Sequence, residues 1–219
     1  MTRYVSEEEF HKKAQSLFLN LRNWSGEALN SAPEDSANRR YLRTLVDTGK
    51  MAALRRGRIG AGTPVATVAW VIEPCIPDNW DDRSPEYRAL YQAALLYTTH
   101  PHTAYMPDGL RYGRPITHAF LQAHGGVRGS DDETKANDRR INFLLDARPD
   151  EIYSRLARVM MPLMNKSEQP VDWIQLARDL RDWDETVKLR WSRGWYGGQR
   201  FMATDKEAPS GDGLSVAEA

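Results

Sequence analysis

The sequence contains a single cysteine, Cys75, among 219 residues. One thiol excludes an intramolecular disulfide and is typical of a reducing compartment, where a lone cysteine is usually a small core residue. Long apolar runs are also missing, because the longest, PVATVAWVI at 64–72, has about half the length that spans a bilayer. The charged N-terminus lacks the apolar core of a signal peptide. We therefore predict a soluble, cytoplasmic protein without a membrane partner.

Net charge is absent too, since 30 basic residues balance 30 acidic ones. This balance excludes the general avidity of a polycation for nucleic acid, so any anion-binding face must arise from segregation of charge. Segregation is visible in the sequence: the segment 37–58 has seven basic residues and one acidic residue, Asp47, whereas acidic residues gather at 78–82 and 131–133. We expect a molecule with poles of opposite charge.

Alternating strand patterns and internal repeats are lacking, and helix signals take their place. Ser6 and Glu9 form a capping box ahead of an apolar stripe, which predicts a first helix to about Trp24. The segment 38–58 predicts one basic helix with four inward side chains: Tyr41, Leu42, Leu45 and Val46. Two further helix starts are predicted where Pro follows a capping hydroxyl: Thr63–Pro64 and Ser84–Pro85. The region 101–113, rich in Pro, Gly and aromatics, predicts a loop.

The second half predicts three long helices, at 135–147, at 150–164 and from Asp172 onward, where Asp172 is the predicted N-cap with Gln175 three residues later. A short helix over 114–126 precedes them, and the polar segment 127–138 predicts a linker or mobile loop. Trp173 and Trp183 lie on an apolar stripe and are predicted core residues. The class is therefore all-α, with two small helical-bundle subdomains at 1–126 and 127–202 and a disordered tail at 203–219.

Catalytic patterns are scarce. His100 and His102 flank a proline and have no further ligand at metal-binding spacing, so a helical enzyme built on them is the weakest hypothesis. The glycines of HGGVRGS at 124–130 lack the preceding strand and the lysine of a phosphate-binding loop. No nucleophile with a base can be recognised, and the sequence predicts neither catalysis nor a cofactor.

What remains is a set of arginines spread over several helices. In KANDRRINFLLDA, 135–147, Ile141 and Leu144 share one helix face, and Arg139 points the opposite way with Phe143. One interpretation is that Phe143 packs on a second helix while Arg139 and Arg140 are solvated or paired with the nearby acids Asp146 and Asp150. The other is a surface that faces phosphate or a partner, because arginine forks bind phosphate without regard to sequence.

The order of motifs is more specific than any one of them. LRRG at 54–57, NDRRINFLLDA at 137–147, LARVM at 156–160, DWIQLARDLRDW at 172–183 and WSRGWYGG at 191–198 follow one another along the chain. This series resembles the small subunit of the type I-E CRISPR surveillance complex, Cascade, the family also called CasB. The resemblance implies an all-helical, non-catalytic subunit, two copies of which bridge the large subunit and the crRNA-binding backbone. It also implies a basic groove that stabilises the displaced DNA strand and the R-loop.

The family's basic positions fall on Arg56, Arg140 and Arg158, with Arg55 and Arg139 as neighbours. Where some members have a basic pair after the tryptophan helix, this sequence has Asp184, Glu185 and Thr186, so contact there is expected only from Lys188 onward. We predict nucleic-acid binding by eight residues: Arg55, Arg56, Arg58, Arg139, Arg140, Arg158, Arg178 and Lys188. The alternative is a purely structural adaptor whose arginines contact only protein.

Overall fold

The computed structural model describes residues 5–30, 32–34, 36–57, 66–77, 80–100, 115–125, 132–164 and 169–197. Within these ranges the chain forms helices and no β-strand, which confirms the all-α class. The helices are α1 (Glu7–Ser25), α2 (Glu27–Asn30), α3 (Ala37–Leu45), α4 (Thr48–Arg55), α5 (Ala66–Ile72), the 3-10 helix η1 (Glu73–Cys75), α6 (Pro85–Tyr97), α7 (Ile116–Ala123), α8 (Asp132–Leu145), α9 (Ile152–Val159), α10 (Met161–Met164), α11 (Trp173–Arg181) and α12 (Glu185–Tyr196).

Three helix starts predicted from capping residues are confirmed. The Ser6 hydroxyl accepts a hydrogen bond from the Glu9 amide at 3.2 Å, and the Ser84 hydroxyl accepts one from Tyr87 at 3.1 Å. The Asp172 carboxylate accepts one from the Gln175 amide at 2.8 Å. Each side chain satisfies an amide that has no partner inside its helix, so these starts are fixed locally.

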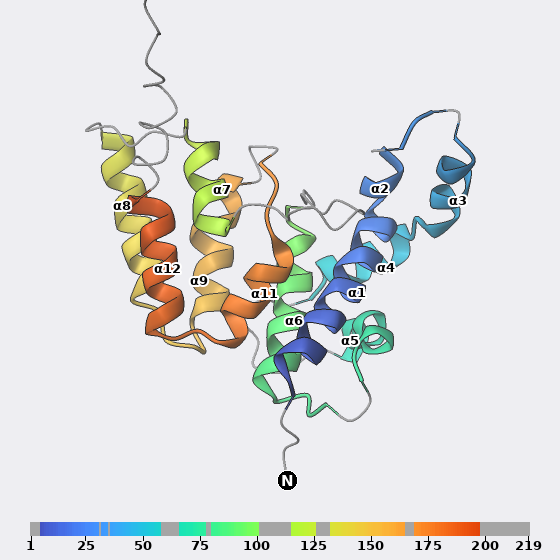
Figure 1. Ribbon diagram of the computed structural model, residues 1–219, viewed down its shortest axis with the longest axis horizontal. Helices are drawn as coiled ribbons and strands as arrows, with labels where there is room; N and C mark the ends of the chain where they lie inside the picture. The colour runs from blue at the N-terminus through green and yellow to red at the C-terminus, as the bar shows by residue number, and fades with distance from the viewer. Residues whose placement is uncertain are drawn as a thin grey trace, which may run out of the picture.

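Two groups of helices flank a central pair (Figure 1). Helices α7, α8, α9 and α12 lie on one side, α1 to α5 lie on the other, and α6 and α11 run between them. The pair α6–α11 has the most extensive interface, and α11 also packs on α1. Helix α7, which lies within the predicted first subdomain, packs on α12 instead. The division at residue 126 stays a prediction.

The core is continuous from α1 to α12 and is rich in tryptophan. Trp173 and Trp183 are 1% and 5% exposed, as the apolar stripe predicts. Cys75 is also buried, and its sulfur accepts a hydrogen bond from the Asn20 amide. Where α7 crosses α12, a β-carbon at Gly194 would collide with the Thr117 side chain, so the absence of a side chain permits this close approach.

The prediction of one continuous helix over 38–58 is wrong. The chain forms α3 and α4 instead, with Val46 in an extended conformation between them. The Asp47 carboxylate accepts a hydrogen bond from the Lys50 amide at 2.9 Å, and the Asp47 amide donates to the Trp24 carbonyl. This cap starts a new helix and redirects the chain. As a result no residue of α3 is buried, and Tyr41, predicted to face inward, is 62% exposed.

Two boundaries in the second half also differ from prediction. Residues 132–138, predicted as part of a linker, form the first turns of α8, where Asp132 and Glu133 lie at the positive end of the helix dipole. The predicted helix 150–164 divides at Met160 into α9 and α10. Pro162 has no amide hydrogen to continue the α9 ladder, and this accounts for the division.

Several expectations concern residues outside the described ranges. They are the Thr63–Pro64 helix start, the loop at 101–113, His102, Arg58 and the tail at 203–219.

Candidate nucleic-acid interface

A shallow pocket with a volume of about 370 Å³ lies between α8 and α9. Its lining residues are Ala136, Arg139, Arg140, Phe143 and Val159. The four on α8 are spaced at i, i+3, i+4 and i+7, which places them on one helix face. Ile141 and Leu144, on the opposite side of α8, are 1% and 0% exposed. Burial of Ile141 and Leu144 therefore turns the face with Arg139, Arg140 and Phe143 outward, as the sequence periodicity predicts.

The two arginines of this pocket, which we call the α8–α9 groove, differ in their hydrogen bonds to the rest of the protein. Arg140 donates a hydrogen bond to Asn137 Oδ1 at 2.6 Å, and Asn137 is 2% exposed. Arg139 is exposed and makes no hydrogen bond or ion pair with any residue that the structure describes. Neither arginine pairs with Asp146 or Asp150 within the described ranges; Asp150 lies 3.8 Å from Arg148 instead. Both guanidinium charges therefore remain available to a ligand.

Phe143 adds an aromatic surface to the groove. Its side chain is 42% exposed, and the Arg155 guanidinium of α9 lies 4.3 Å from the ring centroid. Arg155 also donates to the Phe143 carbonyl at 2.7 Å and pairs with Glu151 at 2.6 Å. Phe143 thus packs on a second helix through Arg155 while part of its ring stays open to solvent.

Arg158 and the α4 arginines are exposed, in two different places. Arg158 is adjacent in sequence to Val159, which lines the groove. Arg55 and Arg56 lie at the C-terminal end of α4, which belongs to the other group of helices (Figure 1). Arg158 therefore belongs to a helix that lines the groove without being one of its lining residues, and Arg55 and Arg56 lie far from the groove.

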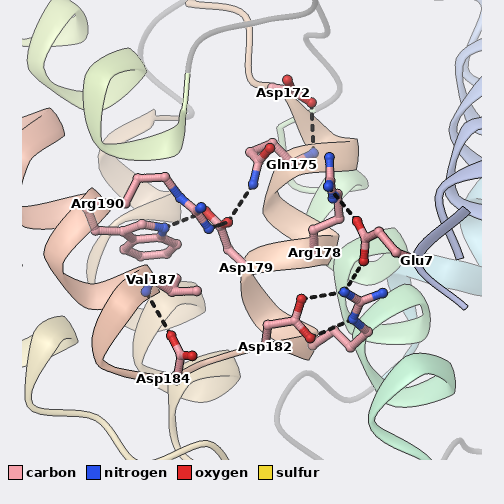
Figure 2. Close-up of polar contacts among 11 residues, drawn as sticks. Glu7, Asp172, Gln175, Arg178, Asp179, Asp182, Asp184, Val187 and Arg190 are labelled. Carbon is pink, nitrogen blue, oxygen red and sulfur yellow. Dashed lines mark hydrogen bonds and ion pairs between the residues drawn. The ribbon is translucent and has the colours of Figure 1, made fainter. Parts of the chain in front are cut away.

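The remaining predicted residues are ion-paired. Arg178 lies 2.5 Å from a Glu7 carboxylate oxygen of α1, and Lys188 lies 2.9 Å from Glu185 within α12. Figure 2 shows Arg178 pointing across from α11 toward Glu7. Among the described candidates, these two have carboxylate partners, whereas Arg55, Arg56, Arg139, Arg140 and Arg158 have none in the described ranges.

Two supporting residues escaped the sequence-based prediction of the site. Asn137 orients Arg140, and Arg155 covers part of Phe143. The i, i+3 spacing of Asn137 and Arg140 is a signal that could have identified the first. Arg155 belongs to another helix, so its contact depends on tertiary packing that no local pattern predicts.

Helix α11 joins the two groups of helices through polar contacts on both of its sides (Figure 2). On one side Asp179, 1% exposed, accepts hydrogen bonds from Trp191 Nε1 at 2.6 Å and Gln175 Nε2 at 2.7 Å, and pairs with Arg190. Burial raises the pKa of the Asp179 carboxyl, although these donors oppose the shift. On the other side Arg178 and Arg181 both pair with Glu7.

The Glu7 cluster predicts a pH dependence of stability. Burial raises the pKa of Glu7, but hydrogen bonds and charge from Arg181 and Arg178 outweigh it, so the pKa is lower than usual. The ion pair therefore stabilises the fold above the ordinary pKa of 4.5 and is lost as pH falls through the folded-state pKa. Glu7→Gln should lower the free energy of unfolding by less than about 1 kcal/mol at pH 7, because Glu7 is largely exposed.

Urea denaturation between pH 7 and pH 3 tests this expectation. The difference between wild type and Glu7→Gln should shrink below about pH 4.5. Glu34→Gln is a matched control, because Glu34 is an exposed carboxylate without an ion pair to a described residue. A Glu7→Gln difference that stays constant down to pH 3 would contradict the assignment.

A metal-binding site would be the other kind of site in this chain. The described residues contain no group of three or more His, Cys, Asp or Glu that could hold an ion. His100 is 1% exposed, and its Nε2 lies 2.9 Å from the Gln169 carbonyl oxygen, where it ties α6 to the start of α11. In the same part of the chain, no helix has both the length and the apolar character to cross a membrane.

Residues 50–196 match the family of CRISPR-associated protein Cse2. The chain belongs to the Cse2 family. This confirms the resemblance to CasB that the sequence motifs indicate, because solved structures of this fold carry both names. The Cse2 match begins inside α4 and includes α5 to α12, and with them the α8–α9 groove, whereas α1 to α3 precede it.

Solved structures share the fold of this Cse2 family member. CasB from M. ruber is 26% identical, with 76% of this chain and 94% of that chain covered and a TM-score of 0.55. CasB from Thermus thermophilus is 23% identical, with 84% and 97% covered and a TM-score of 0.53. A chain of a CRISPR RNA-guided surveillance complex is 19% identical, with 87% and 99% covered and a TM-score of 0.55. No curated protein matches the chain.

Proposed function

We propose that this Cse2 family member is a non-catalytic subunit of an RNA-guided CRISPR surveillance complex, Cascade, in the cytoplasm. Its partners would be the crRNA-containing backbone subunits, the large subunit and a second copy of itself. Its α8–α9 groove would bind the phosphates of the target or displaced DNA strand and so stabilise the R-loop. Family membership and the similarity to a chain of a CRISPR RNA-guided surveillance complex support this proposal.

The observation that carries the nucleic-acid part is the groove itself. Arg139 and Arg140 present guanidinium groups beside the half-exposed ring of Phe143, and no described carboxylate neutralises them. Guanidinium forks bind phosphate oxygens bidentately, and an aromatic ring stacks on bases of any sequence. The combination suits a single strand whose sequence is read elsewhere, by pairing with the guide RNA.

Weak binding by the isolated chain follows from its charge. The chain has no net charge, so long-range attraction to nucleic acid is small and contact depends on the groove. Two copies in one complex would hold the strand at two places, and the second contact would be intramolecular. We therefore expect the groove to act mainly in the assembled complex.

R-loop formation by the reconstituted complex tests the proposal. Arg139→Gln/Arg140→Gln should weaken target binding about 10–100-fold at physiological salt. Loss of two phosphate contacts per copy, four in a complex with two copies, should also make the dependence of log K on log salt shallower by about 3–4 units. Arg158→Gln should have a smaller effect in the same direction, since Arg158 is adjacent in sequence to the groove residue Val159 but does not line the groove.

Two matched controls make this experiment specific. Lys12→Gln/Lys13→Gln removes the same charge from α1, and Arg148→Gln removes a cation that is already paired with Glu151. Both should assemble and bind target like wild type. If the Arg139→Gln/Arg140→Gln complex assembles normally and keeps wild-type target affinity and salt slope, the groove does not bind phosphate.

One observation favours the alternative hypothesis, in which the protein is a structural adaptor whose arginines contact only protein. Arg178 and Lys188, both candidate nucleic-acid ligands, pair with carboxylates in the structure. If all basic residues act in this way, the groove arginines would pair with acids of a neighbouring subunit. Under that hypothesis Arg139→Gln/Arg140→Gln prevents assembly, while any complex that does form binds target normally.

A further inference from the structure

A second pocket, with a volume of about 260 Å³, lies beside the start of α6, far from the α8–α9 groove. It is lined by Glu73, Ile76, Pro77, Trp80, Asp82 and Tyr87. Glu73 belongs to η1, Tyr87 to the first turn of α6, and the others to the connection between these helices. The described residues of the lining thus combine two carboxylates with two aromatic side chains and include no basic residue.

The aromatic walls are held in place before any ligand arrives. The Trp80 ring stacks on Phe10 with centroids 6.2 Å apart and an interplanar angle of 2°, and Trp80 Nε1 donates to Glu9 at 3.4 Å. The Tyr87 amide is bound to the Ser84 cap, and its ring stacks on Tyr91 at 6.5 Å. Because these side chains are already ordered, a ligand would bind without an entropic cost for ordering them.

The polar groups of the pocket have no partner in the part of the chain that the structure describes. Glu73 and Asp82 are exposed and make no ion pair or hydrogen bond there. Tyr87 is 5% exposed, and its hydroxyl likewise makes no hydrogen bond to a described residue. A tyrosine hydroxyl usually has a hydrogen-bond partner, so the Tyr87 hydroxyl remains available to a ligand that enters the pocket.

The electrostatics of the pocket are negative. Burial raises the pKa of Tyr87 to about 12, and the charges of Glu73, Tyr91 and Asp82 add to the shift. Both carboxylates line the same pocket as the Tyr87 side chain. A cation that enters the pocket would meet two carboxylates, an unpartnered hydroxyl and aromatic walls.

We propose that this pocket binds an arginine side chain presented by a partner protein. Two carboxylates provide too few ligands for a structural metal ion, and no described cluster supplies a third. A guanidinium group can pair with carboxylates in its plane while its faces and its methylene stem pack on aromatic rings. The inference does not rest on nucleic-acid binding, because its ligand has the opposite charge to a phosphate.

The test uses the full chain and N-acetylarginine methylamide as the probe. The indole N–H signals of the tryptophans are followed by NMR, and the Trp80 signal is assigned with the Trp80→Phe variant. We expect the Trp80 signal to shift in saturable fashion, with a dissociation constant of about 1 mM. N-acetylcitrulline methylamide has the same shape without the charge and should bind at least about tenfold more weakly.

Three variants decide whether the pocket is the site. Asp82→Asn and Glu73→Gln should each weaken the arginine probe about three- to tenfold, whereas Glu86→Gln, which removes a nearby charge outside the lining, should not. Urea denaturation checks that all three variants keep the wild-type fold. Equal binding of the citrulline probe, unchanged affinity in the Asp82 and Glu73 variants, or no shift of the Trp80 signal would each overturn the proposal. None of these results depends on R-loop formation.

Discussion

Replacement of Trp173 by alanine should lower the free energy of unfolding by about 3–5 kcal/mol. The Trp173 side chain is 1% exposed and lies where α11 meets α1 and α6. Its ring is 6.3 Å from that of Phe18 and packs edge-on against Tyr97 at 5.5 Å. Alanine would leave a cavity at the central interface, and the melting temperature should fall by roughly 6–20 °C.

Thermal and urea denaturation measure this effect. Trp70→Ala is the matched control, since it removes the same side chain from a site that is 50% exposed on α5. It should change the free energy of unfolding by less than about 1 kcal/mol. Equal losses in the two variants would show that Trp173 does not hold the central interface together.

Asp179→Ala should lower the free energy of unfolding by about 2–3 kcal/mol. The variant leaves the Trp191 indole N–H, on a side chain that is 0% exposed, without its acceptor. Gln175 also loses its acceptor, whereas Arg190 is 46% exposed and regains water. The contact between α11 and α12 should weaken, and urea denaturation measures the loss.

Asp179→Asn separates the hydrogen bonds from the charge. Because the folded-state pKa of Asp179 is raised, its ionisation opposes folding as pH rises above about 4. An asparagine oxygen still accepts from Trp191 and carries no charge to desolvate, while its NH2 group replaces the oxygen that accepts from Gln175 and Arg190, so Gln175 must turn its own amide oxygen toward it. We expect Asp179→Asn to lie within about 1 kcal/mol of wild type at pH 7. A loss as large as that of Asp179→Ala would show that the charge itself is required.

The features that were predicted correctly depend on short-range signals. Ser6, Ser84 and Asp172 each cap a helix through an amide three residues away, so four residues of sequence suffice to identify them. The outward position of Arg139 and Phe143 follows from the 100° periodicity of one helix. The family follows from the order of several such segments along the chain.

The features that were missed depend on contacts between distant segments. The break between α3 and α4 involves a hydrogen bond from the amide of Asp47, the N-cap of α4, to the carbonyl of Trp24 in α1. Arg178 looks like a free cation in sequence, but Glu7 neutralises it from the other end of the chain. Charge pattern alone therefore identified basic residues without distinguishing those already paired from those available to a ligand.

The central position of α11 has a consequence for synthesis of the protein. Helix α6 ends at Tyr97, and α11, which covers α6 and α1, begins only at Trp173. At roughly 5–20 residues per second, a ribosome needs several seconds to make the segment between them. During that interval the nascent chain presents apolar helix faces that only later residues bury. Translation that stalls in this window should yield aggregation-prone chains, and these are the natural clients of ribosome-associated chaperones.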